Sequence, residues 1–229
     1  MKIKYVNHSG FTVMDDSCAL MIDCCRFIKD EVNACEGKYL YILASHIHGD
    51  HFNPAIMSLG GSMRKWILSA DIRKKVPQQK DVVFMEKGDV YRDERVAIKA
   101  FGSTDEGISF YIETGGKKIF HAGDLNNWHW NEGETPENAP INERKFLDEL
   151  ALIAKEVPIL DAAMFPVDPR LGTDYTRGAE QFLDSIKTGL FVPMHFWDNF
   201  KAAGSFREAA EQRGSRFADI HGQGDTFEF

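Results

Sequence analysis

The feature that most constrains this chain is an apolar run that ends in a dense set of metal-binding side chains. Tyr39-Leu40-Tyr41-Ile42-Leu43-Ala44 is almost continuously apolar, as expected for a β-strand that is buried on both faces. The segment Ser45-His46-Ile47-His48-Gly49-Asp50-His51 follows it directly. Rigid scaffolds present reactive groups on loops at strand ends. We therefore expect a β-sheet that carries this loop at one edge.

This loop has the composition of a metal site, because three histidines and an aspartate fall within six residues: His46, His48, Asp50 and His51. Imidazole and carboxylate groups are the usual protein ligands of zinc and neighbouring transition metals. In an extended backbone His46 and His48 point to the same side. Gly49 permits a sharp turn, which can bring Asp50 and His51 toward a second position. A lone histidine is more often a core or surface residue, but this density predicts a metal site.

The rest of the chain alternates strand-like and helix-like segments. Strands are expected over Lys2–Val6, Phe11–Met14, Ala19–Ile22, Trp66–Ser69, Val82–Met85, Val96–Phe101, Ile108–Glu113, Lys117–His121, Ile159–Phe165, Leu190–Met194 and Arg216–Ile220. Helices are expected over Pro54–Leu59, Asp71–Lys75, Asn142–Glu156, Thr176–Lys187 and Phe206–Gln212, and an irregular loop over Asn126–Pro140. With no linker or fixed-period repeat, the sequence predicts one α/β domain over residues 1–229.

Charge and composition limit the kinds of molecule that the protein is expected to bind. The net charge of −8 argues against a nucleic-acid binder, since phosphate contacts need clustered Lys and Arg. No apolar run approaches the length of about 18 to 20 residues that spans a bilayer, and no secretory leader is visible. The four cysteines form no disulfide framework and are expected to be buried free thiols. These features predict a cytoplasmic protein with a small-molecule substrate and leave its oligomeric state open.

The sequence His46-x-His48-x-Asp50-His51 resembles the signature of the metallo-β-lactamase superfamily, and the later landmarks follow in order. Gly123-Asp124 resembles the aspartate that bridges two metals, and His195 resembles the last histidine ligand. Asp23 resembles an early aspartate that supports the site. The resemblance is greatest to small members that are similar to L-ascorbate-6-phosphate lactonase. It implies an αββα sandwich, with two mixed β-sheets flanked by helices, and a metal-dependent hydrolase.

The resemblance also implies how the ligands are shared between two metals. His46 and His48 would belong to the first metal, Asp50, His51 and His195 to the second, and Asp124 would bridge the two. The superfamily normally supplies one more histidine to the first metal, but no histidine lies between His51 and His121 here. Either Asp105 or another oxygen group takes its place, or the first site is one ligand short, or only one metal binds. Zinc is the expected ion, and an oxygen ligand would favour manganese or iron.

Further residues are candidates for catalysis or substrate binding, each with a structural alternative. Asp50 is expected to orient a water molecule while it binds metal, and His121 to donate a proton or, alternatively, to pack within a strand. Trp128 and His129 are expected to line a substrate pocket or to belong to an ordinary amphipathic loop. Arg170 is expected to bind an anionic substrate or to form an external salt bridge. His8, in a His-Ser turn, is a further candidate for lining the site.

The function that these residues predict is hydrolysis of a small substrate, phosphorylated or a lactone, by a metal-activated water. Two alternatives remain open at this stage. One is a non-hydrolytic or mononuclear ligand-binding protein with a degenerate first metal site. The other is a di-iron redox protein, which a site enriched in carboxylates would suit.

Overall fold

The computed structural model describes residues 1–59, 63–77, 81–133 and 135–229, and residue 134 of the expected loop Asn126–Pro140 lies outside this range. The described residues form two seven-stranded sheets. The first sheet contains β1 (Lys2–Asn7), β2 (Gly10–Met14), β3 (Cys18–Ile22), β4 (Tyr39–Ala44), β5 (Arg64–Ser69), β6 (Val82–Met85) and β14 (Thr226–Glu228). The second contains β7 (Val90–Arg92), β8 (Val96–Gly102), β9 (Ile108–Thr114), β10 (Lys117–His121), β11 (Ile159–Pro166), β12 (Lys187–Met194) and β13 (Arg216–Phe217).

Both sheets are mixed, and each has an antiparallel half and a parallel half. In the first, β14, β1, β2 and β3 pair antiparallel and β3 to β6 pair parallel. In the second, β7 to β10 pair antiparallel and β10 to β13 pair parallel. Parallel neighbours bring their carboxyl ends to the same edge of a sheet, so the loops that follow them lie together.

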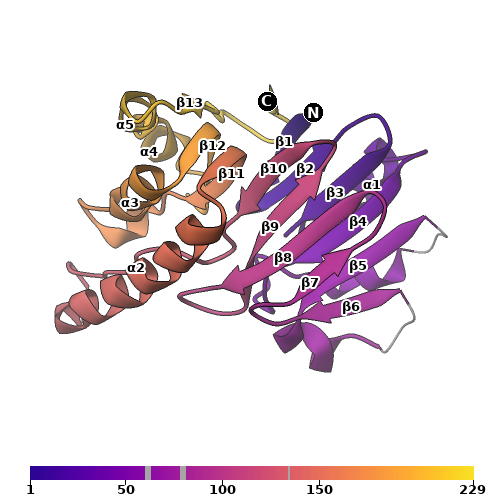
Figure 1. Ribbon diagram of the computed structural model, residues 1–229, viewed down its shortest axis with the longest axis horizontal. Coiled ribbons are helices and arrows are strands. Elements are labelled where there is room, and N and C mark those ends of the chain that lie inside the picture. The colour runs from indigo at the N-terminus through magenta and orange to yellow at the C-terminus, as the bar shows by residue number, and fades with distance from the viewer. Residues whose placement is uncertain (60–62, 78–80, 134) are drawn as a thin grey trace.

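Helices cover the outer faces of the sheets (Figure 1). They are α1 (Ile28–Ala34), α2 (Ala139–Glu156), α3 (Arg177–Ser185), α4 (Phe200–Ser205) and α5 (Arg207–Gln212), with 3-10 turns at Pro54–Ser58, Ala70–Lys75, Pro136–Asn138 and Pro169–Leu171. Helices α2 to α5 lie beside the second sheet, and α1 lies beside the first. Within the described residues, no helix has the length and hydrophobicity needed to cross a membrane. This two-sheet architecture with outer helices is the one that the sequence predicted.

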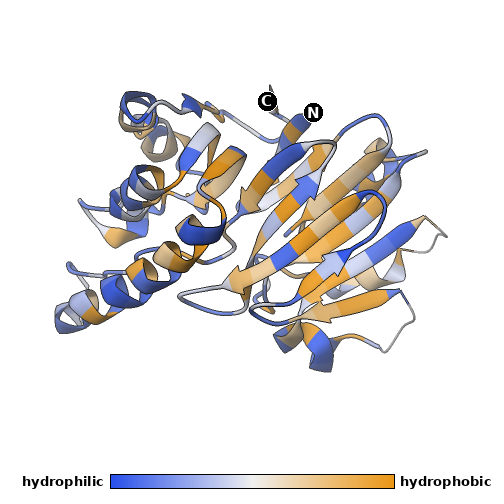
Figure 2. Ribbon diagram, viewed as in Figure 1, coloured by the Kyte–Doolittle hydropathy of each residue, from blue (hydrophilic) through white to orange (hydrophobic). Residues whose placement is uncertain are grey.

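The hydrophobic core explains why the sheets pack in this way. One cluster joins Tyr41 and Leu43 of the first sheet to Ile98 and Phe110 of the second, and extends to Phe146 of α2. A second cluster lies under α1 and includes Ile42 and Trp66, which project from the opposite face of the first sheet. Hydrophobic residues accordingly colour the central strands, whereas hydrophilic residues cover much of α2 and α5 (Figure 2). Alternate residues of β4 thus enter two different cores, as expected for a strand that is buried on both faces.

The structure corrects several of the expected element bounds. The strand expected over Arg216–Ile220 ends at Phe217, whereas the helix expected over Phe206–Gln212 is confirmed as α5 (Arg207–Gln212) and is preceded by an unexpected helix, α4 (Phe200–Ser205). The short elements α1, β7 and β14 were not expected. They have only three to seven residues, so hydrophobic periodicity gives little signal there. All four cysteines are buried free thiols, which confirms that expectation.

Candidate metal centre

The predicted ligands converge at the edge where the parallel strands of both sheets end. The loop after β4 supplies His46, His48, Asp50 and His51, the turn after β10 supplies Asp124, and the end of β12 supplies His195. Ligand atoms of these residues form overlapping groups in which all atoms lie within 4.8 Å of one another. The groups are His46-His51-Asp124, His46-His48-Asp50, His48-Asp105-Asp124 and His8-Asp50-His51-His195. The structure thus brings together all six residues that the sequence predicted as metal ligands.

Asp124 lies at the centre of this arrangement. Its Oδ1 is 3.1 Å from Nε2 of His51 and 3.3 Å from Nε2 of His195. Its Oδ2 is 3.5 Å from Nε2 of His46. One carboxylate therefore faces histidines from both predicted half-sites, as a bridging ligand must.

The part of the chain that the structure describes has buried polar atoms without a hydrogen-bond partner, and several of them point into this centre. They include Nε2 of His46, Nε2 of His51 and Oδ1 of Asp124. Buried polar atoms without a partner cost free energy and are rare in folded proteins. A divalent cation would satisfy imidazole nitrogens and a carboxylate oxygen together. The donor set therefore fits a metal site.

Two buried carboxylates orient the histidine ligands from behind. Oδ2 of Asp23 accepts a hydrogen bond of 2.8 Å from Nδ1 of His51, and Oδ2 of Asp168 accepts one of 2.9 Å from Nδ1 of His195. Nδ1 of His46 lies 3.0 Å from the hydroxyl of Ser45. Each contact occupies Nδ1 and leaves Nε2 directed at the centre. A carboxylate behind a metal-binding histidine fixes its tautomer and increases its basicity as a ligand.

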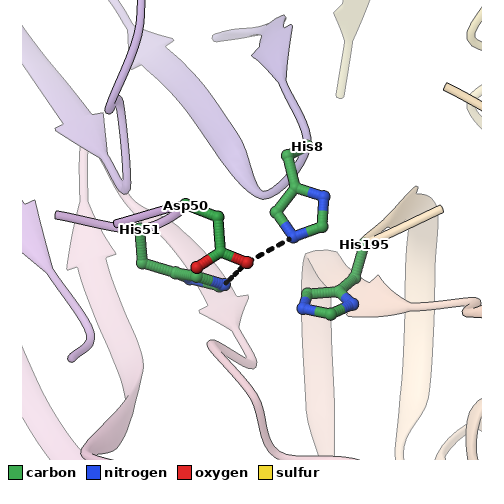
Figure 3. Close-up of side chains that lie close together, drawn as sticks. All are labelled: His8, Asp50, His51 and His195. Carbon is green, nitrogen blue, oxygen red and sulfur yellow. Dashed lines mark ion pairs between the residues drawn. The ribbon is translucent and has the colours of Figure 1, made fainter. Parts of the chain in front are cut away.

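Figure 3 shows the second half-site, in which the Asp50 carboxylate lies between His8 and His51. Oδ2 of Asp50 is 3.3 Å from Nε2 of His8 and 4.0 Å from Nε2 of His51. The rings of His8 and His195 approach to 4.1 Å between centroids. The structure therefore places His8, a candidate for lining the site, directly against two predicted ligands.

The pKa values in the centre are those expected of charges packed closely together. Burial lowers the pKa of His51, but the carboxylates of Asp124 and Asp23 outweigh burial and hold it well above its usual range. Burial, followed by the charge on His51, lowers the pKa of His46 to about 4. Burial raises the pKa of Asp124, but the neighbouring histidines, His51 first, lower it far below its usual range. The imidazoles and carboxylates of the centre therefore shift one another's pKa values, as charges in close contact do.

Strained backbone is concentrated around the same centre. Residues with a positive φ other than glycine include His8 (46°), Asp23 (49°), His195 (62°), Trp197 (49°) and Trp130 (47°). A left-handed φ is unfavourable for residues with a bulky side chain. Such strain persists only where the surrounding structure enforces it, and it clusters at functional sites.

Two cavities flank the centre and contain some of the predicted substrate-binding residues. A cavity of about 350 Å³ is lined by Trp128, Trp130, Asn142 and Arg170 together with Asp124 and His195. On the other side, His8, Arg26, Asn53, Trp197 and Asp198 line a second cavity of about 480 Å³. Three of the four residues expected to contact substrate, His8, Trp128 and Arg170, thus line cavities beside the centre.

His129, the fourth residue expected to contact substrate, is not among the residues that line these two cavities. Its side chain is buried, with Nε2 3.2 Å from the Asp174 carbonyl oxygen. Nδ1 accepts a hydrogen bond of 3.4 Å from the Asn131 backbone. Both ring nitrogens therefore hold the loop after Asp124 to the loop before α3, which is a structural role.

His121 was expected to donate a proton or, alternatively, to pack within a strand. The side chain is fully buried, and Nε2 lies 2.9 Å from the Ser9 carbonyl oxygen. Nδ1 accepts a hydrogen bond of 3.1 Å from Gly123 N–H and lies 3.9 Å from Asp23. Both nitrogens thus contact groups behind Asp23 and the turn that carries Asp124, an arrangement that favours the alternative of packing within the strand.

Two residues that support the centre were not predicted from the sequence. Asp168 is the partner of His195 and also accepts hydrogen bonds of 3.0 Å from Nε of Arg170. Its position after a buried strand, like that of Asp23, was the available signal. Trp197 packs against His8 at 4.4 Å between ring centroids. Nothing in the sequence around Trp197 indicated this contact.

Known proteins resemble the chain over its full length, although no protein-family model matches it. It is 28% identical, over an alignment that covers 99% of each chain, to a protein of Symbiobacterium thermophilum named UPF0173 metal-dependent hydrolase. Among solved structures, Igni18 of Ignicoccus hospitalis, described as a novel metallo hydrolase, is similar with a TM-score of 0.68 and 19% identity, covering 100% of this chain and 98% of that one. The metallo-β-lactamase fold protein YhfI of Bacillus subtilis has a TM-score of 0.65 and 13% identity, covering 99% and 98%.

The similar solved structures confirm the metallo-β-lactamase fold that the sequence predicted, and the relative that aligns over the full length is named a metal-dependent hydrolase. They do not confirm the more specific resemblance to L-ascorbate-6-phosphate lactonase. The metal ion and the substrate are likewise not identified by these relatives.

Proposed function

We propose that this chain is a binuclear metal-dependent hydrolase that acts on a small anionic substrate, a phosphorylated compound or a lactone. His46 and His48 hold the first metal, and Asp50, His51 and His195 hold the second, with Asp124 between them. The observation that carries the proposal is the set of buried, unpartnered donor atoms around Asp124 within the described residues. A bound cation would satisfy these nitrogens and the carboxylate oxygen together, which is why the arrangement supports a metal site.

The chemistry follows from the donor set. When bound, divalent metal ions supply a hydroxide nucleophile at neutral pH and polarise the bond under attack. Asp50 is about one third exposed and lies between His8 and His51, so its carboxylate can orient a water molecule at the cavity. His8 can exchange a proton with Asp50, because its Nε2 lies 3.3 Å from Oδ2 of Asp50. Asp23 and Asp168 keep the ligand rings in place during this exchange.

Arg170 and the surrounding tryptophans favour a negatively charged substrate of modest size. The guanidinium packs over Trp197 at 4.8 Å and over Trp130 at 5.9 Å from the ring centroids. Its side chain remains 47% exposed beside the cavity that Trp128 also lines. Arginine suits carboxylate or phosphate recognition, and the indole rings offer flat apolar walls. These features support a phosphorylated lactone of the kind that the resemblance to L-ascorbate-6-phosphate lactonase implies.

We also propose a zinc, manganese or iron ion at each position and a single catalytic domain over residues 1–229. A cytoplasmic location is consistent with four buried free thiols, which persist in a reducing compartment.

Elemental analysis of the purified protein tests the proposal, with His48→Ala as the diagnostic variant and Lys145→Ala, on the surface helix α2, as the control. We expect close to two metal equivalents in the wild type and the control, fewer in His48→Ala, and hydrolysis of phosphodiester or lactone substrates only by the loaded proteins. Hydrolysis that persists in His48→Ala at the wild-type rate would overturn the proposal.

The same measurement separates the two alternatives. One equivalent that is unaffected by His48→Ala would favour a mononuclear ligand-binding protein with a degenerate first site. Two iron equivalents with a visible absorbance that responds to reductant, and no hydrolysis, would favour a redox protein.

A further inference from the structure

We infer that Asp105 replaces the missing histidine and completes the first metal site, so that both metals have a donor set of two imidazoles and two carboxylates. This inference rests on the proposed binuclear function and identifies the ligand that distinguishes this chain. Donor atoms of His48, Asp105 and Asp124 lie within 4.8 Å of one another. Asp124 is buried and its Oδ1 has no hydrogen-bond partner among the described residues.

The loop that carries Asp105 is fixed in place from both sides. On one side, the Thr104 hydroxyl donates to the Asn126 carbonyl oxygen at 2.6 Å and accepts from Asn126 N–H at 2.9 Å. This ties the loop to the turn that carries Asp124. On the other side, Gly107 lies so close to Ser45 that a Cβ atom there would be 2.1 Å from the Ser45 carbonyl oxygen. Ile108 N–H donates to the same oxygen at 3.0 Å.

These two attachments place Asp105 between the loop of the first histidines and the bridging aspartate. β8 and β9, which flank the loop, belong to the second sheet, whereas Ser45 follows β4 of the first sheet. The position is thus set by the packing of one sheet against the other, and not by local sequence.

Charge also favours a cation at this position. Asp105 and Asp124 are two carboxylates in the same group, and the only imidazole in that group is His48. Two carboxylates this close repel each other. A cation held by both would remove this repulsion.

With Asp105 included, the two half-sites have matched chemistry. The first contains His46, His48, Asp105 and Asp124. The second contains His51, His195, Asp50 and Asp124. Carboxylate oxygens favour harder ions, so replacing one imidazole by a carboxylate shifts the preference of the first site from zinc toward manganese or iron.

The test compares metal binding by the wild type, Asp105→Asn, Asp105→His and the control Glu106→Gln, which removes the neighbouring charge in the same exposed loop. Each protein is stripped with a chelator and titrated calorimetrically with Mn²⁺, Zn²⁺ and, without oxygen, Fe²⁺. Bound equivalents are then counted by elemental analysis. The EPR spectrum of the Mn²⁺ form reports whether the two ions are coupled, and thermal melts verify folding.

We expect two Mn²⁺ equivalents with a coupled-pair spectrum in the wild type and in Glu106→Gln. In Asp105→Asn the affinity for the first-site Mn²⁺ should fall by at least about 100-fold, since loss of an outer partner of a ligand alone costs about 10- to 100-fold. Its spectrum should become that of an isolated ion. Asp105→His should recover two Zn²⁺ equivalents and bind Mn²⁺ more weakly than the wild type.

Two outcomes would overturn the inference, and they differ in what else they overturn. Two equivalents bound by Asp105→Asn with wild-type affinity and an unchanged spectrum would refute the role of Asp105 and leave the binuclear hydrolase intact. A wild type that binds no metal would refute both.

Discussion

Nδ1 of His51 donates a 2.8 Å hydrogen bond to Oδ2 of Asp23, a fully buried carboxylate 28 positions earlier in the chain. The same carboxylate accepts hydrogen bonds of 2.7 Å from the backbone N–H and from the hydroxyl of Ser45. Asp23 thereby joins the end of β3 to the loop after β4. The orientation of the metal loop is consequently fixed by the fold before any metal binds.

Replacing Asp23 by asparagine should weaken metal binding without removing a ligand. The amide cannot supply the charge that fixes the His51 tautomer, and one of its two oxygens becomes an NH₂ group facing donors. We expect about 10- to 100-fold weaker binding at the second site, the cost typical of losing the outer partner of a metal-binding histidine. Isothermal titration calorimetry with Zn²⁺ or Mn²⁺ measures this change.

Asp16→Asn is the matched control, because Asp16 is an exposed aspartate in the turn between β2 and β3. It should bind metal like the wild type. An Asp23→Asn protein with unchanged affinity would show that the hydrogen bond to His51 has no influence on the metal site.

Metal binding should release a proton, and the affinity for metal should therefore increase as the pH rises. The pKa of His51 is held well above its usual range by Asp124 and Asp23, so its Nε2 is protonated in the metal-free protein near pH 7. A metal must displace that proton, and each pH unit below this pKa should weaken binding about tenfold. His46, whose pKa is about 4, is already neutral at pH 7 and adds nothing to this release.

Calorimetry at pH 6, 7 and 8, in buffers with different ionisation enthalpies, counts the released protons. We expect about one proton at pH 7. An affinity that does not change over this range would mean that His51 is neutral in the metal-free protein.

The sequence predicted most of the fold because the strands of the central sheets have strong, local signatures. Tyr39–Ala44 coincides with β4, because a near-continuous apolar run is typical of a strand that is buried on both faces. Lys117–His121 coincides with β10. The three-residue strand β14 was missed because it is defined only by its pairing with β1, at the other end of the chain. Pairing over such a distance leaves no periodicity to detect.

The candidate site was predictable where ligands are dense in sequence and not where they depend on tertiary contacts. His46 to His51 lie within one loop, so their chemistry was visible directly. The contacts of His121 and His129 could not be predicted, because nothing in the sequence reveals that Ser9, Gly123 and Asp174 lie against their ring nitrogens. The pairing of Asp168 with His195 likewise requires β11 and β12 to be neighbours.

Replacing Arg170 by glutamine should reduce affinity for anionic substrates and leave metal content intact. A charged hydrogen bond contributes about 1.5–3 kcal/mol, so KM for a phosphorylated substrate should rise by about 10-fold or more. Neutral substrates should be affected much less. The measurement is steady-state kinetics with phosphorylated and neutral lactones, together with competition by inorganic phosphate.

Arg144→Gln provides the control for this change, because the Arg144 side chain is 78% exposed on α2 and pairs with Asp148 one turn away. Its kinetics should match those of the wild type. Equal losses on charged and neutral substrates in Arg170→Gln would argue that Arg170 acts by holding Asp168 and not by binding an anion.

Gly107→Ala should disrupt the contact between the two sheets at the first metal position. Its φ of 71° is unfavourable for alanine, and the added Cβ would meet the Ser45 carbonyl oxygen and the Cβ of His46 at 2.1 and 2.5 Å.

Gly116→Ala is the matched control, because its φ of 73° carries the same strain while no atom lies within 4 Å of the added carbon. Chemical denaturation should show Gly107→Ala to be less stable than Gly116→Ala by about 1–3 kcal/mol, the usual cost of overpacking. Metal analysis should show loss of the first equivalent in Gly107→Ala alone. Equal stability and metal content in the two variants would mean that the loop of Asp105 does not depend on its contact with Ser45.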